Sequence, residues 1–247
     1  MTGVPATGST TEDEVRALRI NRVHYPVTAL GYGARLGIWV QGCPLACRGC
    51  MARDTWAPDA GTVMPVPEAA ELWRRAASLG ADGVTLSGGE PLAQPQALAA
   101  LLTAIDDVRA GLAGRDVDIL VYTGYEPSEF TPEQRDAVRA ADVLITGRFD
   151  ITAPTGLVWR GSANQRMLLR TPLGRHRYAD LADHVPERTP MQVSVDDDGI
   201  WLIGVPRTGG MSGLERGLLD RGIRLGTRSW RAAGRGVHSS EVSDPGG

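Results

Sequence analysis

Residues 38–50, Ile-Trp-Val-Gln-Gly-Cys-Pro-Leu-Ala-Cys-Arg-Gly-Cys, join an apolar run to all three cysteines of the 247-residue chain. The apolar run predicts a strand, and the thiols of Cys43, Cys47 and Cys50 follow directly after it. One disulfide would leave one of the three thiols unpaired, and cysteines this close in sequence make poor crosslinks. Because thiolates are preferred ligands of zinc and of iron–sulfur clusters, the stretch predicts a metal centre at a strand end.

Two kinds of metal centre compete for these thiols. Structural zinc usually takes four protein ligands, and none of the four histidines (His24, His176, His184, His238) lies within a few residues of the cysteines. A [4Fe–4S] cluster held by three cysteines leaves one iron without a protein ligand, and that iron can bind a substrate or cofactor. The spacing favours the cluster, and zinc stays open because a distant histidine could complete its ligand set.

Composition excludes several classes of partner. The chain is 42% hydrophobic and 22% charged with a net charge of −3, which is ordinary for a globular protein and predicts no nucleic-acid partner. No apolar run approaches the ~20 residues of a membrane-spanning helix. The polar, acidic N-terminus does not resemble a signal peptide. Clustered thiols without a targeting segment predict a cytoplasmic protein that does not bind a membrane.

The pattern of apolar segments predicts an α/β fold with a parallel sheet. Expected strands alternate with expected helices, an arrangement typical of βα units. In such sheets the chemistry lies at the carboxyl ends of the strands. There are too few units for an eight-stranded barrel, so we expect a partial, open one. The expected strands are 20–26, 36–40, 82–87, 117–122 and 142–146, and the helices are 67–79, 94–109 and 131–140.

The sequence divides into four parts. We expect a flexible tail over 1–19, a core domain over 20–190, a C-terminal appendage over 191–231 and a disordered tail over 232–247. Within the core domain, 167–190 is rich in Arg, Pro and His and is expected to be a connecting arm. In the appendage an Asp-Gly pair separates two apolar runs, which predicts a β-hairpin, and a helix is expected after it.

Short motifs give the chain a family resemblance. The spacing Cys43-x-x-x-Cys47-x-x-Cys50, followed by Ser87-Gly88-Gly89-Glu90-Pro91, resembles the cysteine and cofactor-binding motifs of the radical S-adenosylmethionine (SAM) superfamily. Further segments resemble the activating enzymes of anaerobic ribonucleotide reductases, which are glycyl-radical-enzyme activases. The resemblance covers about residues 20–166. These segments are Trp39–Gly42, Thr55–Trp56, Tyr122–Tyr125, Gly147–Phe149 and Trp159–Gln165.

The resemblance implies a cofactor set and a reaction. Cys43, Cys47 and Cys50 would hold a [4Fe–4S] cluster whose fourth iron accepts the amine and carboxylate of SAM. Reductive cleavage of SAM would yield a 5′-deoxyadenosyl radical, which abstracts a hydrogen from a backbone Cα of a partner glycyl radical enzyme. The electron would come from a flavodoxin- or ferredoxin-type reductant.

The segment after the strand at 82–87 is the first expected SAM site. Gly88 and Gly89 let the backbone approach a ligand closely, and Glu90 suits the cationic amine of SAM. Ser87 is the first residue of this segment. The alternative interpretation of the segment is a glycine turn followed by a solvated glutamate.

Four further residues are expected to bind the cofactor. Thr123 and Gly124 follow a strand and are expected to meet the ribose or methionine moiety of SAM, although a simple turn would have the same pattern. Asn164 and Gln165 offer paired donors and acceptors for nucleoside edges or carboxylates. The resemblance also makes Arg35 a candidate near the active site. Arg148 and Arg160 suit a carboxylate or a partner's backbone, but surface ion pairs are commoner for such residues.

Two other functions remain open. The chain could be a radical SAM enzyme that modifies a peptide or a small metabolite, which the appendage suggests because the core activase does not need it. It could also be a non-enzymatic, metal-stabilised binding module.

Overall fold

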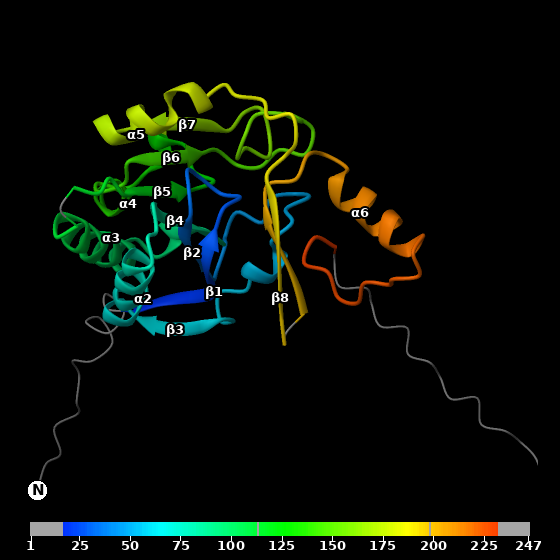
Figure 1. The fold of residues 1–247 in the computed structure, drawn as a ribbon, viewed down its shortest axis with the longest axis horizontal. Helices are drawn as coiled ribbons and strands as arrows, with labels where there is room; N and C mark the ends of the chain where they lie inside the picture. The colour runs from blue at the N-terminus through cyan, green and yellow to red at the C-terminus, as the bar shows by residue number, and fades with distance from the viewer. Residues whose placement is uncertain (1–16, 113, 198, 232–247) are drawn as a thin grey trace, which may run out of the picture.

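The computed structural model describes residues 17–112, 114–197 and 199–231 (Figure 1). The expected tail at 232–247 and most of the one at 1–19 lie outside these residues. The first strand begins at Ala17, inside the expected N-terminal tail.

A seven-stranded mixed sheet forms the centre of the molecule, in the order β3-β1-β2-β4-β5-β6-β7. Strands β2, β4, β5 and β6 run parallel, as the βα pattern predicts. Strands β1, β3 and β7 pair antiparallel with their neighbours at the two edges. The mixed α/β class is confirmed, and the partial-barrel geometry stays a prediction. The strands are β1 Ala17–Val27, β2 Arg35–Val40, β3 Thr62–Pro65, β4 Gly83–Gly88, β5 Asp118–Tyr122, β6 Val143–Thr146 and β7 Arg166–Leu169.

Helices α2 Val66–Ser78, α3 Pro95–Ala110 and α4 Pro132–Ala137 cover one face of the sheet. Figure 1 shows α2 and α3 on the side of the sheet away from α6 Gly210–Leu219. Short 3₁₀ helices lie between these elements. They are η1 Arg53–Thr55, η2 Pro91–Ala93, η3 Pro127–Glu129 and η4 Ala179–Leu181.

Local sequence explains where the helices begin. Pro67 and Pro95 each occupy a first-turn position, where the missing N–H costs nothing. The predicted capping box of α4 is present: Gln134 N donates to Thr131 Oγ1 at 3.2 Å, and Thr131 N donates to Gln134 Oε1 at 3.0 Å. The helix ends at Ala137, three residues earlier than the expected 140.

The expected connecting arm at 167–190 is wrong in part. It contains most of β7, the helix α5 Pro172–Tyr178 and η4. Tyr178 is buried against the sheet face opposite α2 and α3. The arm therefore packs as part of the core domain.

Successive side chains of the parallel strands pack alternately in different core clusters, which defines two faces of the sheet. Ile38, Leu86 and Val121 pack in the large core cluster with residues of α2 and α3. Because successive side chains of a strand point to opposite faces, Trp39, Ser87 and Tyr122 lie on the other face. We call that face, opposite α2 and α3, the inner face.

Arg35 lies at the start of β2, at the opposite end of the strand from the cysteines. It is fully buried and its Nη2 lies 2.6 Å from Asp118 Oδ1, while Arg177 Nη1 lies 2.6 Å from Asp118 Oδ2. Tyr178 OH also donates to Asp118 Oδ1 at 3.0 Å. The proposed place of Arg35 near the active site is therefore wrong: it forms part of a buried ion network at the amino ends of the strands.

Candidate functional site

The three cysteines lie on a loop that begins where β2 ends. All three are half-buried free thiols. The loop turns through left-handed backbone at Ala46 (φ 44°) and Gly49 (φ 83°), and a Cβ on Gly49 would lie 2.5 Å from Ile151 Cδ1. Within the described ranges, no three His, Cys, Asp or Glu side chains are grouped so that they could hold a metal ion. The loop brings the thiols into one region without a preformed ligand set.

The surroundings of the thiols fit an iron–sulfur cluster. Burial raises the pKa of the Cys43 thiol, and the backbone N–H groups of Leu45 and Ala46 act in the opposite direction. Burial likewise raises the pKa of Cys50, and hydrogen bonding from the Ala52 backbone opposes it. Backbone N–H groups aimed at sulfur stabilise the thiolate form, the form that binds iron. Cys43, Cys47 and Cys50 as cluster ligands therefore remain our prediction.

The segment after the loop adds a further donor. Trp56 follows η1, and its carbonyl accepts from Cys43 N at 3.1 Å. Its buried indole N–H makes no hydrogen bond of ordinary geometry with the described residues, but it lies close enough to the Cys50 sulfur to lower the pKa of that thiol. An unpaired buried donor beside a cysteine suits a site that a sulfur-rich group occupies.

The glycine segment at the end of β4 packs directly on the start of the cysteine loop. Gly89 N donates to Val40 O at 2.8 Å, and Glu90 N donates to Gly42 O at 2.9 Å. Gly88 has a φ of 103°, and a Cβ there would lie 2.5 Å from Val40 backbone atoms. A Cβ on Gly89 would lie 2.3 Å from Gly42 O. Glycine is required at both positions because backbone meets backbone.

Glu90 joins the ends of β4 and β5. Its side chain accepts hydrogen bonds from Thr123 Oγ1 at 2.8 Å, Gly124 N at 2.7 Å and Leu92 N at 2.9 Å. The residue is only 1% exposed. The structure thus brings together three residues that the sequence proposed separately. The contact of Glu90 with the SAM amine stays a prediction, and both carboxyl oxygens already have partners within the protein.

Replacing Glu90 by Gln tests this junction. The amide NH₂ would oppose a backbone N–H, so we expect the free energy of unfolding at neutral pH to fall by about 1–3 kcal/mol. Burial raises the pKa of Glu90 against the effect of its three donors. Wild-type stability should therefore fall as the pH rises from about 4.3 through the raised pKa, a slope that the Gln variant lacks. Urea unfolding across that pH range measures both effects, and parallel pH profiles would contradict this account.

Gly124 brings the β5 end against the cysteine loop. A Cβ on Gly124 would lie 2.3 Å from Leu45 Cδ1, in the middle of that loop. Ser87 lies half-buried on β4, in register with Trp39 of β2. Leu45 is a contact that could not be predicted from the sequence, since a leucine between two cysteines shows no pattern of its own.

Asn164 and Gln165 lie beside the end of β6. Asn164 Nδ2 donates to Arg148 O at 2.8 Å, and Gln165 Nε2 donates to Gly147 O at 2.9 Å. Gln165 Oε1 accepts from Gly161 N at 2.7 Å. These amides hold the loop against the end of β6, and their contact with SAM stays a prediction.

The two other arginine candidates have protein partners. Arg148 pairs with Glu129 at 2.7 Å, and its guanidinium lies 5.5 Å from the Tyr125 ring centroid. Arg160 is buried, and one of its guanidinium nitrogens donates to Ala182 O. Arg148 lies on the rim, near enough to Cys47 for that thiol to influence its pKa.

A cavity of about 420 Å³ opens beside the cysteine loop. The side-chain amides near it are engaged: Gln41 Nε2 donates to Ala57 O at 2.8 Å, and Gln94 Nε2 donates to Gln41 O at 3.0 Å. The cavity thus offers mainly apolar wall beside the thiol. It is lined by Arg19, Gln41–Pro44, Trp56, Pro58, Ala93 and Gln94.

No helix in the described part of the chain is long and apolar enough to span a membrane.

Comparisons with known proteins agree with this site. Residues 29–168 match the family described as the 4Fe–4S single cluster domain. The anaerobic ribonucleoside-triphosphate reductase-activating protein of Haemophilus influenzae is 36% identical over 146 residues, which cover 58% of this chain and 92% of that protein. Its Escherichia coli K12 counterpart is 36% identical over 149 residues, covering 58% of this chain and 93% of its own length.

The crystal structure of QueE from Escherichia coli aligns with 89% of this chain and 97% of its own, at 14% identity and a TM-score of 0.39. A likeness of that size carries no argument about function.

Proposed function

The chain belongs to the 4Fe–4S single cluster domain family and to the anaerobic ribonucleoside-triphosphate reductase-activating proteins, and on that premise we propose that it is a radical SAM activase. Its cofactors are a [4Fe–4S] cluster and SAM. Its protein substrate is a glycyl radical enzyme of the anaerobic ribonucleotide reductase class. A flavodoxin- or ferredoxin-type protein supplies the electron, and the clustered thiols suit the reducing cytoplasm.

One observation carries the proposal: the ends of β4 and β5 converge on the cysteine loop that follows β2. Gly89 packs against Gly42, and Gly124 packs against Leu45. Glu90 fastens the glycine segment to Thr123. A cofactor held by the loop therefore lies within reach of the backbone at the ends of β4 and β5.

The residues of the site have separate tasks. Cys43, Cys47 and Cys50 would hold the cluster. When bound, the cluster and SAM supply reductive cleavage of a sulfonium C–S bond, giving methionine and a 5′-deoxyadenosyl radical that takes a hydrogen atom from a glycine Cα. Ser87, Gly88 and Gly89 would present backbone to the methionine end of SAM. Glu90 holds Thr123 and Gly124 in place beside it.

Electron paramagnetic resonance tests the proposal. The protein is reconstituted anaerobically with iron and sulfide, reduced with dithionite and incubated with SAM and each glycyl radical enzyme of the host. We expect a protein-centred glycyl doublet that disappears when SAM is omitted. Absence of the doublet with every such enzyme, from protein that holds its full cluster, would contradict the substrate assignment.

A second candidate function rests on the appendage. Residues 191–231 lie beyond the matched 29–168, so this chain carries material that the shared family region lacks. A radical SAM enzyme that modifies a peptide or small metabolite is the alternative. A modified small product, formed without any glycyl doublet, would favour it.

A further inference from the structure

The β8–β9 hairpin covers part of the inner face of the sheet. Strands β8 Met191–Asp196 and β9 Gly199–Gly204 pair antiparallel, so Ser194 faces Trp201 and Val195 faces Ile200. Ile203 is 1% exposed, whereas Val195 is 72% exposed. One face of the hairpin therefore packs on the core domain and the other faces outward. Figure 1 shows β8 running across the end of the sheet where β1 and β2 lie.

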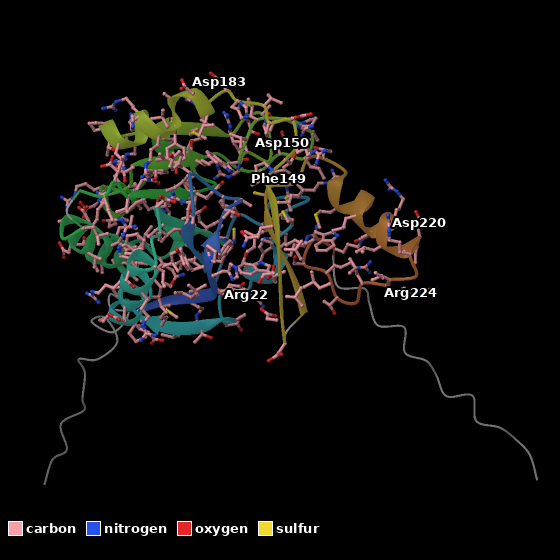
Figure 2. The ribbon with its side chains drawn as sticks, in the orientation of Figure 1. Arg22, Phe149, Asp150, Asp183, Asp220 and Arg224 are labelled. Carbon is pink, nitrogen blue, oxygen red and sulfur yellow. The ribbon has the colours of Figure 1, made fainter. Side chains whose placement is uncertain are left out.

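Trp201 is the main contact of the hairpin with the sheet. Its ring centroid lies 4.6 Å from that of Trp39 in an edge-to-face arrangement and 5.4 Å from that of His24. The Arg22 guanidinium lies 4.9 Å from the Trp201 ring centroid, and Figure 2 labels this arginine beside the hairpin. Gly37 makes room for the pair, since a Cβ there would lie 2.3 Å from the Trp39 ring.

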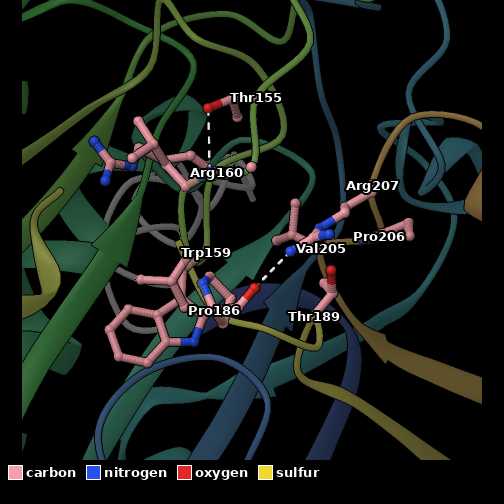
Figure 3. A pocket seen from close by; sticks show the side chains of 11 residues that line it. Thr155, Trp159, Arg160, Pro186, Thr189, Val205, Pro206 and Arg207 are labelled. Carbon is pink, nitrogen blue, oxygen red and sulfur yellow. Dashed lines mark hydrogen bonds between the residues drawn. The ribbon is translucent and has the colours of Figure 1, made fainter. Parts of the chain in front are cut away.

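Polar contacts fix the position of the hairpin. The Gln192 amide accepts from Thr28 N at 3.0 Å and donates to Pro26 O at 2.8 Å. Where the hairpin ends, Arg207 Nη2 donates to Pro186 O at 2.5 Å (Figure 3). Those contacts lie at the open end of the hairpin, and at its turn Arg22 Nη1 donates to Asp196 Oδ2 at 3.0 Å. Side-chain contacts at both ends thus hold Trp201 against the sheet.

The end of the appendage meets the cysteine loop. Ser229 Oγ donates to Met51 O at 2.7 Å, and Arg53 N donates to Ser229 O at 3.3 Å. Met51 directly follows Cys50 in the chain. The appendage therefore contacts the core domain both under the rim and beside the cysteines.

Three aromatic rings lie on the inner face directly below the rim. Trp39 precedes Val40, on which Gly88 packs, and Tyr122 precedes Thr123. Trp39, Tyr122 and Trp201 all pack on the small cluster that contains Ile203. All three are only half-buried, so each keeps accessible surface. We call these three residues the aromatic wall.

We propose that Trp201 is a substrate-contacting residue, and that the glycine-bearing backbone segment of the partner packs against the aromatic wall. This inference rests on the proposed function. A segment around glycine has little side-chain bulk, so its peptide planes can lie on aromatic faces while its Cα reaches the rim. Aromatic residues partly buried at a binding site supply large contact area at low entropy cost. The appendage thereby adds a determinant of partner choice to a site built by the core domain.

Substitutions at Trp201 test the wall. We expect Trp201→Ala to raise the partner concentration for half-maximal glycyl radical by about 10- to 30-fold. Trp201→Phe should stay within about threefold of wild type. Trp201→Leu keeps apolar volume but removes the aromatic ring. It should raise the half-maximal partner concentration as much as Trp201→Ala does, and so separates loss of the ring from loosening of the hairpin in the alanine variant. Val195→Ala, on the outward face of the same hairpin, is the matched control and should not change the value.

Two readouts separate this inference from the proposed function. SAM affinity, measured by equilibrium binding, should be the same in all variants, because the wall meets the partner. Binding of the partner without reductant is followed by quenching of indole emission. A partner that binds without forming a radical contradicts the proposed function alone. If the partner forms its glycyl radical and Trp201→Leu leaves the half-saturation unchanged, the aromatic wall is overturned while the proposed function stands.

Discussion

Replacing Cys43, Cys47 and Cys50 together by alanine is expected to abolish both iron binding and 5′-deoxyadenosine formation. We propose these thiolates as the protein's ligands to the cluster, and no other cysteine exists in the chain to replace them. Without the cluster no electron can reach SAM. Iron and sulfide analysis after anaerobic reconstitution, with chromatography of the nucleoside product, measures both losses.

The matched control for this triple variant is Arg48→Ala, which changes an exposed side chain of the same loop. It should keep full iron content. The triple variant should keep the wild-type fold, since all three cysteines are only half-buried and the core cluster contains none of them. If the triple variant retained four irons per chain, or if Arg48→Ala lost them equally, these cysteines would not be the ligands.

The parallel half of the sheet could be predicted because its strands are buried on both faces. Ile119–Val121 is a continuous apolar run, and in Val84–Leu86 only Thr85 interrupts the apolar residues; glycine or polar residues bound both segments. The edge strands gave a weaker pattern. Thr62–Pro65 is four residues long and mostly exposed, and Arg166–Leu169 begins with an exposed arginine. Only their pairing with neighbours makes them strands.

The candidate site was predictable where residue type and strand ends coincide. Cys43, Gly88 and Thr123 each follow or end a strand, so parallel pairing places them on one rim. The sequence does not predict the hydrogen-bond partner of Glu90, because Thr123 lies 33 positions away in the chain. Trp201 was hidden for a similar reason: it lies in the continuous apolar run Ile200–Ile203, which predicts a strand but not which of its faces packs on the core domain.

Arg35 shows why a polar residue beside a motif can mislead. Its guanidinium meets Asp118 at 2.6 Å and Thr85 Oγ1 at 2.7 Å, with both ionic side chains fully buried. Asp118 also holds Arg177, so one carboxylate serves two guanidinium groups. The network joins β2, β4, β5 and α5 at the end of the sheet opposite the rim. Its task is therefore to fix the scaffold on which the rim is built.

Asp118→Ala is expected to lower the free energy of unfolding by about 3–5 kcal/mol, because it leaves the buried Arg35 guanidinium without its counter-charge. Arg177, only 10% exposed, and the Tyr178 hydroxyl would lose the same partner. This loss in unfolding free energy is larger than the net stabilisation that the ion network provides. The reason is that most of the loss comes from leaving a charge buried and unpaired, and not from the missing attraction. Urea denaturation at pH 7 measures it.

Glu71→Ala is the matched control for this prediction, since it removes an ion pair with Arg74 in which both side chains are about half exposed. It should cost no more than about 1 kcal/mol. A double variant, Asp118→Ala with Arg35→Met, separates the two sources of the loss: removing the stranded charge should recover part of the stability. If Arg35→Met lowered the free energy of unfolding of the Asp118→Ala variant as much as it lowers that of the wild type, the unpaired guanidinium would not be the cause. The scaffold would then depend on Arg35 through its packing and its bond to Thr85, and the carboxylate would be a secondary support.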